Sequence, residues 1–145
     1  MKIVLQRVKK AKCTVNEKIT GEINQGYLLL VGYTDGDDAS KNIKAAKKIA
    51  NLRVFEDAGG KMNLDIKTVM GQILAVSQFT LYANTSEGNR PSFIDALNPL
   101  LAKELYLDFC AQLRTYDLLV AEGIFGAHMD LEFINDGPVT IIFEF

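Results

Sequence analysis

The chain has 145 residues, 48% of them hydrophobic, with 16 basic side chains against 18 acidic ones. One domain of this length buries roughly 70% of its unfolded surface, so it needs neither a disulfide nor a metal to hold its core. The balanced charge lacks the basic excess typical of nucleic-acid-binding proteins, and no apolar run reaches the roughly 18 residues of a membrane helix. Two cysteines without a Cys-x-x-Cys spacing and a start without a signal-peptide pattern predict a reduced, cytoplasmic protein.

The first third of the chain is typical of short strands followed by a helix. We expect strands at Ile3–Val8, Thr14–Ile23 (a hairpin) and Tyr27–Val31. Asp38 or Ser40 can then cap a helix that runs to about Leu52. The expected apolar stripe of this helix is Ile43, Ala46, Ile49 and Ala50.

The remainder alternates strands with a second helix. Further strands are expected at Arg53–Phe55, Ile73–Val76, Leu118–Glu122, Met129–Ile134 and Val139–Phe145. The second helix starts at Asn98, with Pro99 at its first position, where proline's missing N–H is not needed. Its expected apolar stripe is Leu101, Leu105, Phe109 and Leu113. The whole pattern predicts an α+β fold: a single strand-rich domain over residues 1–145, with a mixed or antiparallel, barrel-like sheet and two main helices.

The last predicted strand is too apolar to remain an exposed sheet edge. Val139, Ile141, Phe143 and Phe145 share one face of it. An exposed apolar edge promotes aggregation, so we expect this strand to be paired or covered, with a second subunit as one possible cover.

Two polar segments interrupt the apolar runs, and they are the main candidates for a functional site. Ser77–Leu81 follows one predicted strand, and Asn135–Thr140 precedes another. Thr80 is the best hydroxyl, but no base is visible beside it, and a threonine without a base is a poor nucleophile. Gly137-Pro138 also fits a hairpin turn between two strands.

Other chemistries have little support in the sequence. His128 is the only histidine, so any triad would depend on that one ring. No metal-ligand spacing and no phosphate-binding glycine loop occurs, and we expect no metal and no cofactor. Arg7 alternates with Ile3 and Leu5, which places it either on a buried face with partners or on an exposed edge.

Together the two polar segments resemble the paired signatures of the D-aminoacyl-tRNA deacylases (the D-tyrosyl-tRNA(Tyr) deacylase family), which remove D-amino acids wrongly esterified to tRNA. Five further matching segments fall in the family's order along the chain: Gln6–Val8, Gly60–Leu64, Arg90–Phe93, Leu105–Tyr106 and Gly123–Met129.

The resemblance implies an ester hydrolase in which Ser77, Gln78, Phe79 and Thr80 form the side of the site that holds the ester and the terminal adenosine. The backbone N–H groups of Phe79 and Thr80 would act as an oxyanion hole, and the 2′-hydroxyl of the tRNA would help to activate water. The implied partners are tRNA and a second copy of the chain, with no membrane and no DNA.

The resemblance also implies how a D-amino acid is selected. Gly137 and Pro138, joined by a cis bond, would enter the partner's site, hold the α-amino group and exclude L side chains. Arg7 would pin their carbonyls, and Met129 would line the pocket. Because glycine has no side chain to exclude, glycyl-tRNA mischarged on tRNA(Ala) is an expected second substrate.

Two alternatives remain open from the residues. In one, the chain is a non-catalytic, dimeric nucleic-acid-associated module whose polar segments are only turns. In the other, it is a small-ester hydrolase that uses Thr80 and His128. Two basic stretches can be docking surfaces or ordinary solvated faces: Lys2, Arg7, Lys9, Lys10 and Lys12 near the start, and Lys41, Lys44, Lys47 and Lys48 on the first helix.

Overall fold

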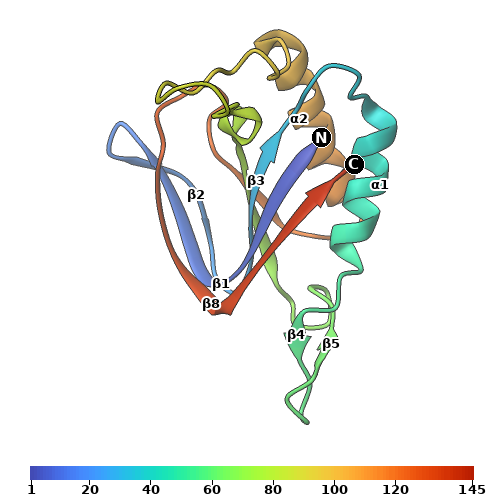
Figure 1. The fold of residues 1–145 in the computed structure, drawn as a ribbon. Coiled ribbons are helices and arrows are strands. Elements are labelled where there is room, and N and C mark those ends of the chain that lie inside the picture. Colours follow the sequence, from blue (N-terminus) through green and yellow to red (C-terminus); the bar gives the residue numbers. More distant parts are fainter.

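A six-stranded mixed sheet forms the centre of the computed structural model, which describes residues 1–145 (Figure 1). Its strands are β1 (Lys2–Val15), β2 (Lys18–Ile23), β3 (Gly26–Gly32), β6 (Gln72–Ser77), β7 (Val120–Glu122) and β8 (Asp130–Glu144). The order is β2-β1-β3-β6-β7, with β8 on the other side of β1; β6 is parallel to β3 and β7, and the other pairs are antiparallel. The predicted α+β class with a mixed sheet and two main helices is confirmed.

The sheet curls until it almost closes into a barrel, so that β2 at one edge lies close to β7 at the other. Gly21 of β2 shows how close this approach is: a Cβ at that position would lie 2.8 Å from the carbonyl oxygen of Glu122. The hairpin that leads into β2 was predicted, and it turns at Asn16 and Glu17, both with positive φ.

Two helices, α1 (Ala39–Ala50) and α2 (Pro99–Arg114), cover one face of the sheet (Figure 1). Asp38, one of the two predicted caps, accepts hydrogen bonds from the N–H groups of Ser40 and Lys41. The Asn98 side chain caps α2 by accepting from the N–H of Leu100. Neither helix is long and apolar enough to cross a membrane.

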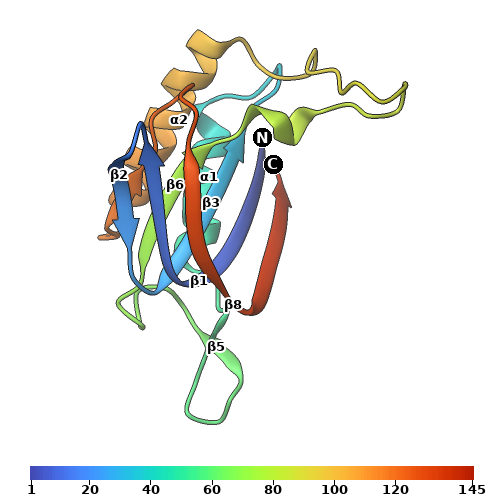
Figure 2. The same ribbon diagram turned by 90° about the vertical axis from the view of Figure 1, so that its left-hand side faces the viewer.

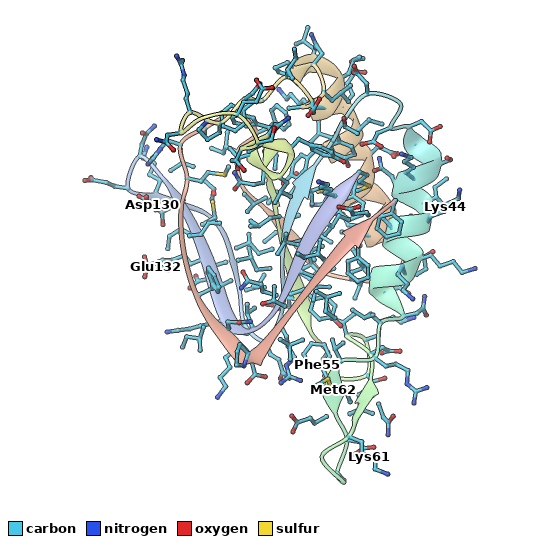
Figure 3. The ribbon with its side chains drawn as sticks, in the orientation of Figure 1. Lys44, Phe55, Lys61, Met62, Asp130 and Glu132 are labelled. Atoms are coloured by element: carbon cyan, nitrogen blue, oxygen red, sulfur yellow. The ribbon has the colours of Figure 1, made fainter.

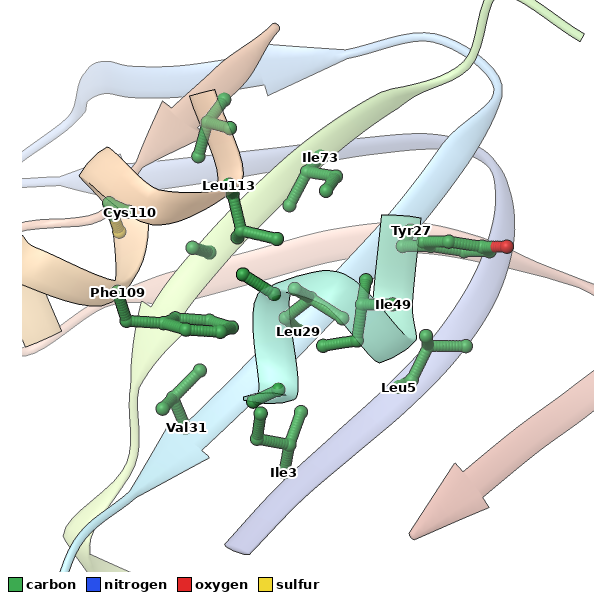
Figure 4. Packing of buried hydrophobic residues seen from close by; sticks show 14 of the residues in the cluster. Ile3, Leu5, Tyr27, Leu29, Val31, Ile49, Ile73, Phe109, Cys110 and Leu113 are labelled. Atoms are coloured by element: carbon green, nitrogen blue, oxygen red, sulfur yellow. The ribbon is translucent and has the colours of Figure 1, made fainter. Parts of the chain in front are cut away.

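The two faces of the sheet bury separate apolar clusters. On β3, Tyr27, Leu29 and Val31 point toward the helices and belong to the larger cluster (Figure 4). Leu28, between them, belongs to a smaller cluster inside the curl of the sheet. This alternation explains why β3 reads as a continuous apolar run, since a strand buried on both faces needs apolar residues at every position.

Both predicted helix stripes were wrong at their first position. Ile43 is 51% exposed and Leu101 is 53% exposed. The buried position on α1 belongs instead to Asn42, which is fully buried. Its amide donates to the carbonyl oxygen of Leu105 and to the Asp108 carboxylate, so a polar side chain that joins the two helices replaces the expected apolar one.

The two last predicted strands are one strand. Both halves of β8 pair antiparallel with β1, Val8 opposite Asn135 and Gln6 opposite Thr140. A hairpin would pair the halves with each other, so the alternative interpretation of Gly137-Pro138 as a hairpin turn does not hold. The segment from Asp136 to Val139 is instead a bulge, at which β8 bends sharply (Figure 1).

Two smaller elements project from the sheet. β4 (Phe55–Glu56) and β5 (Met62–Leu64) form a short arm whose tip carries Lys61 (Figure 3). The predicted strand at Arg53–Phe55 is therefore shorter and lies further along the chain. The 3-10 helix η1 (Phe79–Tyr82) follows β6, and the segment between η1 and α2 extends away from the body (Figure 2).

Candidate active site

A cavity of about 550 Å³ lies at the C-terminal ends of β3 and β6. Gly32 and Gln78 line it from the two strand ends, and Pro99 from the start of α2. The segment that leads into β8, including Met129, closes another side. Parallel neighbouring strands end at the same edge of a sheet, which is why β3 and β6 deliver their following residues to one place.

No carboxylate, lysine or arginine lines this cavity, and its only titratable side chains are Tyr33 and His128. Burial, with the nearby Cys110 and Asp108, raises the pKa of Tyr33, whose hydroxyl lies within hydrogen-bonding distance of Asn42 Oδ1 and the carbonyl oxygen of Leu105. Tyr33 therefore stays neutral. The His128 side chain is 96% exposed, at the rim of the cavity.

The Ser77–Thr80 segment passes from strand to 3-10 helix beside the cavity. Ser77 is the last residue of β6, and the N–H of Gln78 donates to the carbonyl oxygen of Val31, 2.7 Å away. Phe79 and Thr80 open η1, and the first N–H groups of a helix have no acceptor within it. The chain thus presents backbone donors at the point where the strand ends.

Thr80 has no base beside it. The hydrogen bond to its hydroxyl comes from Gln78 Nε2, 2.5 Å from Thr80 Oγ1, and an amide N–H cannot accept a proton from the threonine. Burial, followed by the charge of Glu122, raises the pKa of the Cys110 thiol to about 12, so that cysteine is not a nucleophile at neutral pH.

Arg7 and Gly137-Pro138 form a second cluster, at the bulge of β8. The Gly137-Pro138 bond is cis, and Gly137 has a φ of +117°. Arg7 is 4% exposed, so the predicted buried alternative is correct. Its Nη1 donates to the carbonyl oxygen of Val54 at 2.5 Å, and its Nε lies 3.2 Å from both the carbonyl oxygen and Oδ2 of Asp136.

Asn135 ties the two sides of the bulge together, a contact that the sequence reasoning missed. Its Nδ2 donates to the carbonyl oxygen of Arg7 at 3.0 Å and to that of Val139 at 3.1 Å. The only sequence signal was an asparagine two residues before Gly-Pro, which is equally common in ordinary turns.

The two clusters lie at opposite ends of the sheet. The bulge is paired with β1 next to Gly26 and Leu28 of β3, whereas the cavity lies at Val31 and Gly32. Gly32 is six positions beyond Gly26, which is about 20 Å of extended strand. The structure therefore brings together Ser77, Gln78, Phe79 and Met129, with Thr80 beside them, and keeps Arg7, Gly137 and Pro138 apart from them within one chain.

The sequence matches one family over almost its whole length. Residues 4–144 match the family described as D-Tyr-tRNA(Tyr) deacylase. Three curated bacterial proteins called D-aminoacyl-tRNA deacylase are similar to it. The protein of Lactobacillus gasseri is 51% identical and that of Deinococcus radiodurans 50%, each aligned over 99% of both chains. That of Fusobacterium nucleatum is 54% identical over 99% of this chain and 95% of its own.

Two solved structures have the same fold. One, described as a c-Myc DNA unwinding element binding protein, is 39% identical with a TM-score of 0.91, covering 99% of this chain and 98% of its own. The other, described as a probable eukaryotic D-amino acid tRNA deacylase, has a TM-score of 0.85 over 98% of this chain and 97% of its own. At 18% identity, that second likeness concerns the fold alone.

Proposed function

The chain belongs to the D-Tyr-tRNA(Tyr) deacylase family and is a hydrolase that deacylates D-aminoacyl-tRNA; from that premise we propose how its two clusters divide the work. The cavity holds the terminal adenosine and the ester, and the bulge of a second subunit supplies chiral selection. The observation that carries this proposal is the separation of the two clusters, together with a cavity that has no charged side chain.

Hydrolysis in the cavity relies on position rather than on a nucleophilic side chain. The N–H groups of Phe79 and Thr80 stabilise the negative charge that develops on the ester oxygen when water attacks. The 2′-hydroxyl of the adenosine helps to activate that water. An aminoacyl ester is already reactive, so oxyanion stabilisation and orientation are sufficient.

A homodimer brings the bulge to the cavity. The sheet face opposite the helices carries Val4, Gln6, Thr140 and Ile142, and Ile142 is 67% exposed although it is paired with Val4 of β1. Apolar exposure of this kind is typical of an interface. A two-fold axis perpendicular to this face makes the strands of the two subunits run in opposite directions. The bulge of each chain then lies at the cavity of the other.

Chirality is then selected by exclusion. Gly137 and Pro138 of the partner subunit hold the α-amino group with their carbonyls and occupy the space that an L side chain needs. No pocket for a particular side chain is required, so many D-amino acids are accepted. Glycine fits as well, which makes glycyl-tRNA(Ala) a second substrate.

The test is single-turnover hydrolysis of D-, L- and glycyl-aminoacyl-tRNA by the purified protein, combined with sedimentation at micromolar concentration. We expect D- and glycyl-tRNA to be hydrolysed, L-tRNA to be spared, and a mass twice that of the 16.1 kDa chain. Ile142→Lys places a charge in the interface and should yield an inactive monomer. A monomeric Ile142→Lys variant with the parental rate would rule out the shared site.

The nucleic-acid-associated alternative has one observation in its favour, the likeness to a structure described as a DNA unwinding element binding protein. A binding module would retain tRNA or DNA without releasing an amino acid. Comparing amino-acid release with duplex-DNA binding by the same preparation separates the two functions. Hydrolysis by Thr80 and His128 is disfavoured, because His128 lies at the rim and Thr80 is bonded to Gln78.

A further inference from the structure

We propose that the outer face of α1 docks the phosphate backbone of RNA. This α1 lysine face is defined by Lys44, Lys47 and Lys48, all exposed. No acidic side chain lies within α1, and none of the three lysines forms an ion pair. Figure 3 shows Lys44 on the side of α1 that faces away from the sheet.

The lysines near the start of the chain differ from these, although the two groups look alike in sequence. Lys12 Nζ lies 2.8 Å from Glu132 Oε1, and Lys2 Nζ lies 3.5 Å from Glu144 Oε1. Lys9 Nζ is 3.9 Å from Asp136 Oδ1. These three lysines therefore have acidic neighbours on β8, whereas Lys44, Lys47 and Lys48 of α1 have none.

Part of the arrangement on α1 has a structural explanation, because Lys47 and Lys48 lie in the last turn, where positive charge interacts favourably with the helix dipole. Lys44 lies outside that turn and gains nothing from it. The residues that pack α1 against the rest of the protein are on the opposite side of the helix. They are the buried residues Asn42, Ala45, Ala46, Ile49 and Ala50. Lys44 and Lys48 stand four residues apart, where like charges destabilise a helix by a few tenths of a kcal/mol. In a chain of net charge −2, such a concentration of unpaired positive charge fits a polyanion such as RNA.

The location of α1 suits an RNA whose 3′ end lies in the cavity, and to that extent the inference rests on the proposed function. α1 begins shortly after Tyr33, which lines the cavity, and runs about 18 Å toward the other end of the molecule. The face proposed for dimerisation is on the other side of the sheet, so the α1 lysine face stays free in the dimer. The partner that fits is the phosphate backbone of the same tRNA, away from its reacting end.

The experiment compares a triple variant, Lys44→Gln with Lys47→Gln and Lys48→Gln, against a control of equal charge change, Lys18→Gln with Lys61→Gln and Lys67→Gln. Glutamine keeps the helix propensity of lysine. Each protein is given D-aminoacyl-tRNA and the small ester D-aminoacyl-adenosine, over a range of salt concentrations.

We expect kcat/KM of the α1 variant on the tRNA to fall at least about ten-fold at low salt. The dependence of log(kcat/KM) on log salt should become shallower by about 3, because three phosphate contacts are lost and each removes about 0.9. The rate of the α1 variant on the adenosine ester should not change. The control variant should match the parent on both substrates. Replacing the same three α1 lysines by arginine should preserve turnover of the tRNA.

Equal losses in the α1 variant and the control, or an equal loss on both substrates, would overturn the proposal. A parent protein that hydrolyses neither substrate would instead contradict the proposed function. These two failures are therefore distinguishable in one series of measurements.

Discussion

The two ends of the sheet hold their polar groups in opposite ways. At the cavity end, Phe79 is 57% exposed, Thr80 is also exposed, and the backbone donors face open space. At the bulge end, Arg7 is buried and bonded to Asp136, and Asn135 bonds to both sides of the bulge, while Gly137 and Pro138 themselves are exposed. The polar groups at the cavity end therefore have few side-chain contacts, whereas the bulge is supported by a buried guanidinium and an amide.

This difference indicates where substitutions should be costly. A buried guanidinium is tolerated only when carbonyls and carboxylates satisfy it, so removing it leaves its partners unpaired. A side chain at the cavity end is hydrated in the free protein, so its removal leaves no buried polar group without a partner. Stability should therefore be sensitive at the bulge and insensitive at the cavity.

Arg7→Met should have the largest effect. The Val54 carbonyl and Asp136 lose their donor, and we expect the free energy of unfolding to fall by about 3 kcal/mol, with loss of deacylation. Urea unfolding followed by circular dichroism measures this. Arg53→Met is the control, because Arg53 makes comparable bonds to Asn63 on the exposed arm. Equal costs for both variants would mean that burial is not what matters at Arg7.

Gly137→Ala should come next. An added Cβ would lie 3.0 Å from Arg7 Nη2 and 3.0 Å from Val139 Cγ2, at a φ that side chains rarely adopt. We expect a loss of about 2 kcal/mol and a clear fall in D-aminoacyl-tRNA hydrolysis. Gly60→Ala is the control that measures the free-energy cost of the positive φ alone. Gly60 also has positive φ, but a Cβ added there would meet no atom within 4 Å. The proposed role of the bulge fails if Gly137→Ala keeps the parental rate and D-over-L preference.

Asn135→Asp should cost less, about 1 kcal/mol, because it replaces two hydrogen-bond donations with an oxygen that faces two carbonyls. We also expect D-over-L preference to relax, since the bulge is less firmly held. Asn84→Asp is the matched control: Asn84 uses only its side-chain oxygen, which an aspartate keeps. A folded Asn135→Asp variant with unchanged preference would show that the clamp does not act on selection.

Thr80→Ala should have the smallest effect. The change of stability should stay within about 0.5 kcal/mol, as for an exposed residue, and most deacylation should remain because backbone donors act on the ester. Single-turnover hydrolysis with equal amounts of folded protein measures this. A loss of about 10⁴-fold, the scale seen when a true nucleophile is removed, would make Thr80 covalent.

One part of the candidate site could be located from the sequence, because Ser77, Gln78, Phe79 and Thr80 are contiguous. Ser77–Thr80 follows an apolar strand, and a strand that stops must deliver the next residues to the edge of the sheet. Arg7 remained ambiguous, since alternation with Ile3 and Leu5 fits a buried or an exposed face. Asn42 and Asn135 were missed because local patterns do not reveal the distant carbonyls that satisfy a buried amide.

Local chemistry by itself determined the elements of this protein: proline and asparagine at the start of α2, the turn before β2, and a β3 that is apolar on both faces. Only the tertiary structure decided that two apparent strands are the halves of β8, since that depends on both finding the same partner, β1. It also decided that Lys2, Lys9 and Lys12 of β1 lie beside acidic side chains of β8 while Lys44, Lys47 and Lys48 of α1 do not, and that the cavity and the bulge lie at opposite ends of the sheet. These features depend on contacts between residues distant in sequence, and a one-dimensional pattern does not contain such distances.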